Sequence, residues 1–278
     1  MKIAIVTDST ADLRAQDVEL YDIGVVPLDV IFGNDTYRDG VDLTASAFYE
    51  KMASQAELPK TSQPPTGRFV ACFDDYLKRY EAILGIFLSG KLSGTLQGAQ
   101  TAASMGDGKV TVFDSKTTTA ALGFQVLEAA RMAQSGASME EIVARIEYMR
   151  EGTKAYIVLD TLDNVHRGGR IGGAAKLVGS LLQIKPVIYL VDGLVEVFSK
   201  VRTYKRAVDS LLLHFEEQTQ GKRKVQAGLI YTAGAEIDSV LSRMRAIAPS
   251  ADIQVTMIGP VVGVHVGAGG VGLVYYAE

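Results

Sequence analysis

The chain has 278 residues, a length that suits one large domain or two domains of modest size. Its formal net charge of −4 argues against general nucleic-acid binding, which requires a basic surface to neutralise phosphates. The single cysteine, Cys72, excludes an intrachain disulfide, and no apolar run approaches the ~20 residues that span a bilayer. The apolar part of Met1–Thr10 is too short for a signal peptide, so we expect a cytoplasmic protein.

In the first half of the chain, short apolar runs alternate with helical patterns. Strands are predicted at Lys2–Thr7, Ile23–Phe32, Ala82–Leu88 and Lys109–Ser115, and Pro27 predicts an edge position or a bend in the middle of the second. Helices are predicted at 44–55 behind a cap at Asp42 or Thr44, after a loop at Lys60–Gly67 with Thr66 as N-cap, and at 95–105. Two more are predicted up to about residue 150, the second with a capping box at Ser138 and Glu141. This alternation is typical of βαβ units, so we predict a Rossmann-like parallel sheet with helices.

The second half has a different pattern, in which a hairpin signal stands out. Two apolar strands within Ile184–Val201 flank Asp192-Gly193, a pair typical of type I′ turns. A helix at Tyr204–Gln218 and further short strands follow, including one predicted at Val261–Gly267. We therefore predict an α/β protein with two domains. Residues 1–152 would form the N-terminal parallel domain, and residues 153–278 a C-terminal α+β domain with a mixed or antiparallel sheet.

Polar residues stand after four of the apolar or rigid segments of the first domain. At the carboxyl ends of parallel strands, such residues commonly line a ligand crevice. Any one of them is more simply explained as a helix cap, and only their recurrence at one sheet edge favours a site. The residues are Asp8, Ser9, Thr10, Thr61, Ser62, Ser89, Ser93, Thr95, Asp114 and Ser115.

The segment Ser89–Thr95, SGKLSGT, is similar to two known motifs and completes neither. A Walker loop needs glycine, four residues and then Gly-Lys-Ser/Thr, an order that is absent. A nucleophile elbow needs serine at the third position, whereas the serine of Gly90–Gly94 is fourth. The remaining interpretation of this segment is a binding site for an anion. Ser93 is followed by Gly94 at the predicted start of a helix, where hydroxyl and backbone N–H groups can bind negative charge.

The three histidines, at positions 166, 214 and 265, are too widely spaced to predict a metal site. In the strand predicted for this segment, His265 would share one face with Gly263 and Gly267, and the two glycines would leave room for a ligand. A buried structural histidine is an equal alternative. His214 lies in a pattern typical of a surface helix, and we expect it to be structural.

Three basic runs stand out in this acidic chain, at residues 166–170, 200–206 and 221–224. Most such runs are simply solvated faces. The functional alternative is a rim for an anionic ligand or a docking surface for an acidic partner. Nothing in these runs or among the histidines predicts a metal or an organic cofactor.

Seven segments of the chain are informative when they are taken together and in order. They are VTDSTADL, KTSQPPTG, SGKLSGT, VFDSKT, LDTLDNVHRGGRIG, LLQIKPVI and GPVVGVHVGAGGVGLVYY. Singly most of these segments are weak signals, but in this order they are specific, and with them the chain resembles the DegV family. One departure is visible: the family segment after the histidine usually reads H-T-G-P-G, whereas Val266 and Ala268 stand here.

The resemblance implies a two-domain DegV-like fold with a long-chain fatty acid, such as palmitate, in a buried tunnel between the domains. It implies that Thr61 and Ser93 hold the carboxylate, with His265 nearby. Arg170 and Arg202 match basic positions near the head group or near a docking surface for a kinase. The resemblance implies a supporting role for the neighbouring loop residues Ser62, Gly90, Gly94 and Thr95.

Proteins of this family resemble the fatty-acid-binding subunit of the bacterial fatty acid kinase. The resemblance therefore implies a non-enzymatic carrier that presents the carboxyl group to a separate ATP-dependent kinase, which makes an acyl phosphate for phospholipid synthesis. It also allows transient contact with a membrane. Burying the acyl chain would contribute ~0.8 kcal/mol per CH₂. Two alternatives stay open: a hydrolase with Ser93 as nucleophile and His265 as base, and a regulatory protein that senses the same ligand.

Overall fold

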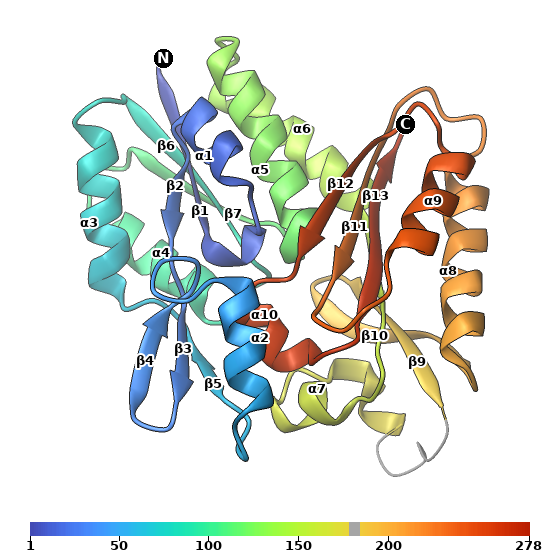
Figure 1. Cartoon of the computed structure of the whole chain (residues 1–278). Coiled ribbons are helices and arrows are strands. Elements are labelled where there is room, and N and C mark those ends of the chain that lie inside the picture. Colours follow the sequence, from blue (N-terminus) through green and yellow to red (C-terminus); the bar gives the residue numbers. More distant parts are fainter. Residues whose placement is uncertain (178–183) are drawn as a thin grey trace. The chain divides into compact units, whose positions relative to one another are not determined.

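The computed structural model describes residues 1–177 and 184–278, and its contacts divide the chain into two compact units (Figure 1). Unit 1 comprises Met1–Leu43 and Thr61–Glu151, and unit 2 comprises Thr44–Lys60 and Gly152–Glu278. The segment Thr44–Lys60 thus shares its contacts with the C-terminal half, although it precedes residue 152 in the chain. Of the motif LLQIKPVI, the first three residues (181–183) lie outside the described residues.

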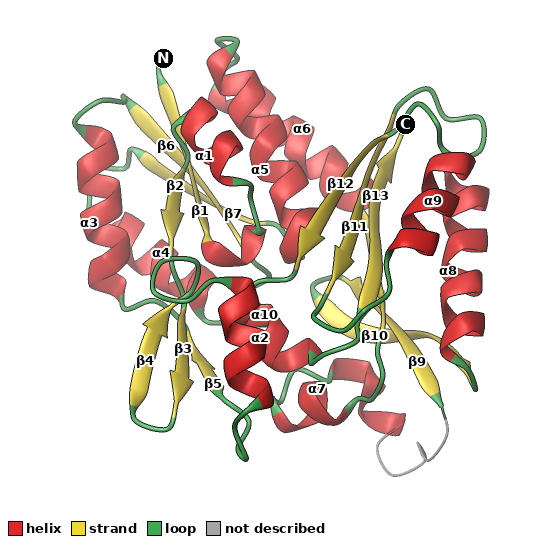
Figure 2. Ribbon diagram, in the orientation of Figure 1, coloured by secondary structure: helices red, strands yellow, loops and turns green. Residues whose placement is uncertain are grey.

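Unit 1 is built on the predicted parallel sheet, with strand order β2-β1-β6-β7. The strand residues alternate between two cores. Ile3 and Ile5 pack with Leu122 of α5 on one face, whereas Val6 packs with Phe69 of α3 on the other. Figure 2 shows helices on both sides of this sheet. The bounds are β1 Ile3–Asp8, α1 Ala15–Tyr21, β2 Gly24–Val26, α3 Thr66–Leu77, β6 Ala82–Phe87, α4 Thr95–Ser104, β7 Val110–Asp114, α5 Thr119–Gln134 and α6 Met139–Gly152, with a 3₁₀ turn η1 at Ser9–Ala11.

Local sequence signals set several of these boundaries. The capping box is formed, because Ser138 Oγ accepts a hydrogen bond from Glu141 N (3.2 Å) and Glu141 Oε2 accepts one from Ser138 N (2.8 Å). The prediction that Thr66 caps α3 is wrong. Thr66 is the first helical residue and Pro65 precedes it in an extended conformation, so the helix begins without a side-chain cap.

The single strand predicted at Ile23–Phe32 is interrupted at Pro27, where a bend or an edge was expected, and its two halves are separate strands in different sheets. β2 pairs with β1, whereas β3 (Asp29–Phe32) lies between β4 (Asp35–Arg38) and β5 (Lys60–Ser62). The start of the predicted loop at Lys60–Gly67 is therefore strand β5, because its backbone finds a partner in β3.

Unit 2 contains a mixed sheet with strand order β10-β9-β8-β13-β11-β12, in which β11 and β12 are parallel and the other neighbours are antiparallel. The predicted hairpin is confirmed: Asp192 and Gly193 both have positive φ, 46° and 80°, as a type I′ turn requires. The bounds are α2 Ala45–Ala53, β8 Lys154–Val158, α7 Asp163–Arg167, η2 Gly172–Leu177, β9 Lys185–Val191, β10 Leu194–Val201, α8 Tyr204–Thr219, β11 Val225–Tyr231, α9 Asp238–Ile247, β12 Asp252–Met257, α10 Pro260–Val266 and β13 Val271–Ala277.

The strand predicted around His265 is wrong, because this segment is helix α10. Pro260 occupies the first helical position, and Gly267 ends the helix with a positive φ of 77°. Packing explains the outcome. A Cβ at Gly263 would lie 2.7 Å from Tyr49 Oη and 2.8 Å from Phe48 Cε1, so the glycine lets α10 approach α2 closely. Tyr49 also donates to the carbonyl of Ile258, at 3.1 Å.

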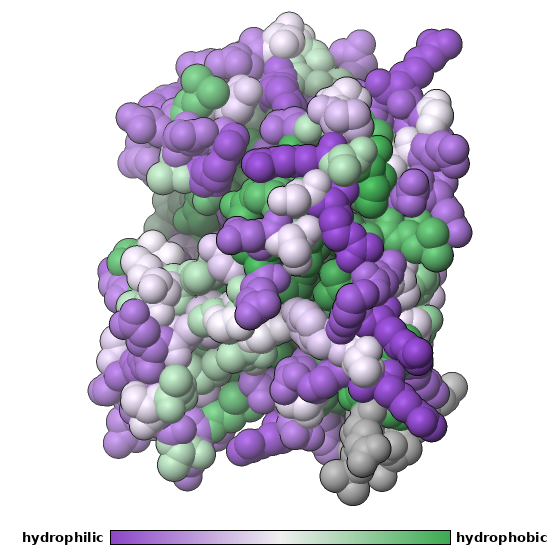
Figure 3. All heavy atoms as spheres, turned by 45° about the vertical axis from the view of Figure 1, so that its right-hand side comes forward, coloured by the Kyte–Doolittle hydropathy of each residue, from purple (hydrophilic) through white to green (hydrophobic). Residues whose placement is uncertain are grey.

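The surface of the molecule is mixed in character. On the face drawn in Figure 3, apolar residues (green) lie among polar ones (purple). Within residues 1–177 and 184–278, the structure has no helix with the length and apolar character needed to cross a membrane.

Candidate functional site

In unit 1, polar residues meet at the carboxyl ends of three neighbouring strands. Asp8 ends β1, Leu88 follows β6, and Asp114 ends β7. The carboxylate of Asp8 accepts a hydrogen bond from Leu88 N (2.8 Å), and Asp114 Oδ1 accepts one from Gly90 N (3.4 Å). The polar residues after β1, β6 and β7 therefore share one edge of this sheet, whereas Thr61 and Ser62 end β5 in the separate sheet β4-β3-β5.

The loop Ser89–Thr95 is held by its own backbone and by the start of the segment before α5. Ser89 N donates to Thr117 O (2.9 Å), and Ser93 N donates to Ser89 O (3.2 Å). The Ser93 hydroxyl lies 2.9 Å from Thr95 Oγ1 and accepts from Thr95 N at 3.3 Å. Ser89 and Thr95 are buried whereas Ser93 is only partly buried. Ser93 thus lies two residues before α4, and its hydroxyl accepts from the N–H of Thr95, the first residue of that helix.

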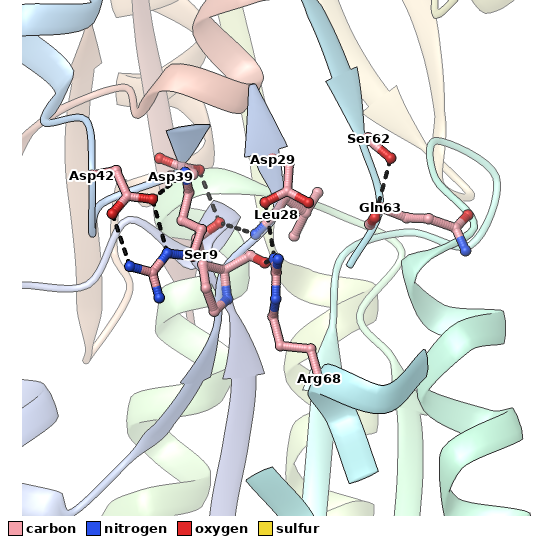
Figure 4. A network of polar contacts seen from close by, with 10 residues as sticks. Ser9, Leu28, Asp29, Asp39, Asp42, Ser62, Gln63 and Arg68 are labelled. Carbon is pink, nitrogen blue, oxygen red and sulfur yellow. Dashed lines mark hydrogen bonds and ion pairs between the residues drawn. The ribbon is translucent and has the colours of Figure 1, made fainter. Parts of the chain in front are cut away.

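The end of β5 lies beside this loop. A Cβ at Gly94 would be 1.9 Å from Gln63 Oε1, so the chain after Thr61 and Ser62 reaches the residue that precedes α4. Thr61 is partly buried and Ser62 is exposed, and the Ser62 hydroxyl donates to Gln63 O at 3.2 Å (Figure 4). Unit 1 therefore brings the β5 end and the Ser93 loop together, through Gln63 and Gly94.

A polar network holds the bend between β2 and β3 (Figure 4). Arg68 of α3 donates to Pro27 O (2.6 Å) and to Asp29 Oδ1 (2.9 Å). Ser9 donates to Asp39 Oδ2 (2.8 Å) and accepts from Leu28 N (3.1 Å). Ser9 was a candidate from its place after β1, and in the structure its hydroxyl is used to fix this bend. The sequence gives no signal for Arg68, because an isolated arginine in a helical pattern does not indicate a partly buried side chain that holds a bend.

His265 in unit 2 stands in α10 against the segment that follows α7. A Cβ at Gly168 would lie 2.2 Å from His265 Nδ1, and one at Gly267 would lie 2.8 Å from Asn164 Nδ2. The glycine that gives the imidazole its space is therefore Gly168, and the strand-based pairing with Gly263 and Gly267 is wrong. Burial, and then the positive charge of Arg170, lower the pKa of His265 to about 4. At pH 7 the imidazole is neutral and can donate one hydrogen bond.

The two arginines named from the sequence are both exposed residues of unit 2. Arg170 follows α7 and its guanidinium donates to Gly168 O at 2.8 Å. Arg202 directly follows β10. Of the named site residues, Arg170 and His265 are therefore neighbours within unit 2, while Thr61 and Ser93 belong to unit 1. Among the residues that the structure describes, no cluster of three or more histidine, cysteine or acidic side chains could hold a metal ion.

Comparison with known proteins identifies the family. A family model described as "Uncharacterised protein, DegV family" matches residues 2–278. The chain belongs to the DegV family. A DegV domain-containing protein of Halalkalibacterium halodurans is 38% identical over 282 aligned positions, which cover 100% of this chain and 99% of the relative. The resemblance seen in the sequence motifs is thereby confirmed.

Solved DegV structures share the fold over the full length of the chain. A DegV family protein from Thermus thermophilus, described by its fatty acid binding, has a TM-score of 0.93 and 33% identity, with 100% of both chains covered. DegV from Bacillus subtilis, described as a fatty acid binding protein, has a TM-score of 0.93 and 34% identity, again with 100% of both chains covered. The predicted fold class, a parallel sheet followed by a mixed sheet, is confirmed for this DegV protein.

Proposed function

We propose that this DegV protein binds a long-chain fatty acid and presents its carboxyl group to a separate ATP-dependent kinase. The observation that carries the first half is the full-length match to two solved relatives, both described as binding fatty acids and both above 30% identity. The kinase half comes from the resemblance of the family to the binding subunit of the bacterial fatty acid kinase. Acyl phosphate made in this way would serve phospholipid synthesis.

The carboxylate would be bound by the hydroxyls of Ser93 and Thr61 and by the imidazole of His265. An ionised carboxylate removed from water needs several hydrogen-bond donors. Ser93 offers its hydroxyl just before the start of α4, where the first backbone N–H groups of a helix have no partner within the helix. A neutral His265 supplies a donor without adding charge, because its pKa is about 4. This set of groups suits binding of a carboxylate at neutral pH.

The hydrolase alternative finds less support. A general base works best when its pKa lies near the working pH, and burial and Arg170 lower the pKa of His265 to about 4. The Ser93 hydroxyl is also engaged by Thr95 in a local turn, as a cap residue would be. We therefore assign Ser93 the role of hydrogen-bond donor and propose that the protein itself is not catalytic.

The exposed Arg170 and Arg202 are proposed as part of the surface that meets the kinase. Guanidinium groups recognise carboxylates and phosphates in two-point contacts. Exposed charges of this kind accelerate encounter with an acidic partner more than they add to affinity. Ser62, Gly90, Gly94 and Thr95 would shape the loop around the head group. The acyl chain would be buried in the protein, and delivery of the product would allow transient contact with a membrane.

Native mass spectrometry of protein purified from a lipid-containing host tests the first half directly. We expect a mass increment that matches a long-chain fatty acid and that is lost on delipidation. The delipidated protein should take up palmitate or oleate from solution. Repeated failure to do so would overturn the proposal. Acyl phosphate formed only when the loaded protein, ATP and a fatty acid kinase are combined would support the second half.

A further inference from the structure

One buried carboxylate stands beside the proposed binding loop without belonging to it. Asp8 is the last residue of β1, and its side chain is 0% exposed. Oδ1 accepts hydrogen bonds from Thr10 N (2.9 Å) and Thr10 Oγ1 (2.6 Å), and Oδ2 accepts one from Leu88 N (2.8 Å). The two oxygens of one carboxylate therefore tie the end of β1 and its 3₁₀ turn to the first residue after β6.

The bond to Leu88 fixes the point at which the Ser93 loop leaves the sheet. Ser89, the next residue, donates to Thr117 O (2.9 Å), and its own carbonyl accepts from Ser93 N (3.2 Å). Two successive backbone amides at the start of the loop are thus held from opposite sides, Leu88 by Asp8 and Ser89 by Thr117. Ser93 is linked to this fixed start of the loop by the hydrogen bond from its own N–H to the carbonyl of Ser89.

We propose that Asp8 is a positioning residue whose ionised carboxylate, by holding the Leu88 amide, fixes the Ser89–Thr95 loop in the geometry that binds the ligand carboxyl group. The proposal rests on the proposed fatty-acid function and deepens it. A neutral cap such as serine would satisfy the turn at Ser9–Ala11 alone. A carboxylate has two oxygens, so one can accept from the turn while the other accepts from the start of the loop. Burying it is costly unless both oxygens are hydrogen-bonded.

The charged groups on neighbouring elements have partners of their own. Asp39 accepts from Ser9, and Asp114 accepts from Gly90 N and from Lys116 N. In helix α5, which packs against β1, the first charged side chain is Glu128, and it pairs with Arg131 and Arg145. Burial raises the pKa of Asp8 to about 6, while its three donors act in the opposite direction. The imidazole of His265 has a pKa of about 4 and does not titrate near pH 6.

The test compares palmitate affinity between pH 8 and pH 5.5 in the wild type and in Asp8→Asn. The amide of asparagine retains one acceptor and presents a donor where Leu88 N needs an acceptor. We expect the wild type to lose affinity as pH falls through about 6, beyond the change caused by the ligand's own titration. Asp8→Asn should bind roughly tenfold or more weakly at pH 8 and should lack that extra transition. A wild-type affinity at pH 8 in Asp8→Asn would overturn the proposal.

Two further variants separate positioning from general damage. Asp17→Asn removes another buried carboxylate, one that pairs with Arg14 and does not bond the loop, and should leave affinity and pH profile unchanged. Thr10→Val removes a donor that lowers the Asp8 pKa, so the transition should move to higher pH. If Asp8→Asn does not fold, Thr10→Val tests the proposal in its place. An affinity transition of Thr10→Val at the same pH as that of the wild type would then contradict the role of Asp8.

Amide NMR of the ligand-free protein distinguishes failure of this inference from failure of the proposed function. In the wild type, the Leu88 and Ser93 amide signals should shift together with a midpoint near pH 6, and in Asp8→Asn they should not. If Leu88 or Ser93 did not respond, the positioning role would be rejected whatever the protein binds. If both responded but palmitate did not bind at pH 8, the positioning role would stand and the fatty-acid function would fall.

Discussion

The backbone of Gly168 lies directly against the imidazole of His265. A Cβ at position 168 would be 2.2 Å from His265 Nδ1 and 3.0 Å from the carbonyl oxygen of Asn164. Movement of the imidazole alone could relieve the first contact but not the second, because the second involves backbone. The glycine within the basic run at 166–170 is therefore a packing requirement of the histidine, and this relationship leads to the first prediction.

Gly168→Ala should displace the His265 side chain and weaken fatty-acid binding by roughly tenfold, since one donor to a charged group would be lost. Overpacking of this kind should also lower stability by about 1–3 kcal/mol. Isothermal titration with palmitate and thermal denaturation measure the two effects. Gly169→Ala is the matched control: it strains a position with φ of 71°, but a Cβ there meets nothing within 4 Å. Equal losses of affinity in both variants would contradict the prediction.

Gly263→Ala should destabilise unit 2 by about 1–3 kcal/mol, because the added methyl group would press on the aromatic rings of Phe48 and Tyr49. Gly67→Ala provides the comparison. Gly67 lies in the first turn of α3 with open space around its Cβ, so alanine there should stabilise by up to about 1 kcal/mol. Chemical denaturation measures both. A neutral Gly263→Ala would mean that α10 and α2 can move apart at little cost.

Asp8 should make unit 1 less stable as pH rises. Its pKa is 3.8 in the unfolded reference and about 6 in the folded chain, so the folded state binds the proton more tightly. The stabilisation from this group is complete below pH 3.8 and is lost as pH rises through about 6. The loss amounts to about 3 kcal/mol, from 1.36 kcal/mol per pKa unit. Denaturation curves measured between pH 4 and pH 8 should show that Asp8→Asn lacks this fall in the free energy of unfolding. A fall of the same size in the variant would mean that another group causes it.

His265 should act in the opposite direction on unit 2. Its pKa falls from 6.5 to about 4 on folding, so the unfolded state binds the proton more tightly. Its contribution is complete above pH 6.5 and is lost as pH falls through about 4, with a size of at most about 3 kcal/mol because the side chain keeps some exposure. In His265→Gln, the free energy of unfolding should fall less than in the wild type as pH is lowered through about 4. His214→Gln serves as a comparison, since the pKa of His214 is also lowered by burial but His214 lies elsewhere, beside Tyr156.

Ser93→Ala and Thr61→Val should each raise the dissociation constant for palmitate by roughly tenfold, because each would remove a proposed donor to the ligand carboxylate. Ser62→Ala should have a smaller effect, since Ser62 is exposed and its hydroxyl already donates to Gln63 O. Fluorescence displacement of a labelled fatty acid would rank the three variants. A larger loss in Ser62→Ala than in Ser93→Ala would move the head group away from the proposed contacts.

Much of the fold follows from local sequence. Continuous apolar runs in β1 and β6, the capping box at Ser138 and the Asp192-Gly193 turn all predict elements that the structure contains. These signals act over a few residues, so they can be recognised without knowledge of distant contacts. The residue types of the proposed carboxylate site, serine and threonine beside glycine after a strand, can be recognised in the sequence for the same reason.

Tertiary structure decided what depends on residues far apart in the chain. The apolar alternation around His265 fits a strand as well as a short helix, and the close approach of α10 to α2 at Gly263 selects the helix. The same is true of Arg68, whose partners lie about 40 residues away, and of Asp8, whose bond to Leu88 spans 80 residues. Sequence alone determined the strands β1 and β6, the turn at Asp192-Gly193 and the polar residues that follow β1, β6 and β7. The partners of Asp8 and His265, and with them both pKa values, are set by burial and long-range hydrogen bonds that only the folded chain creates.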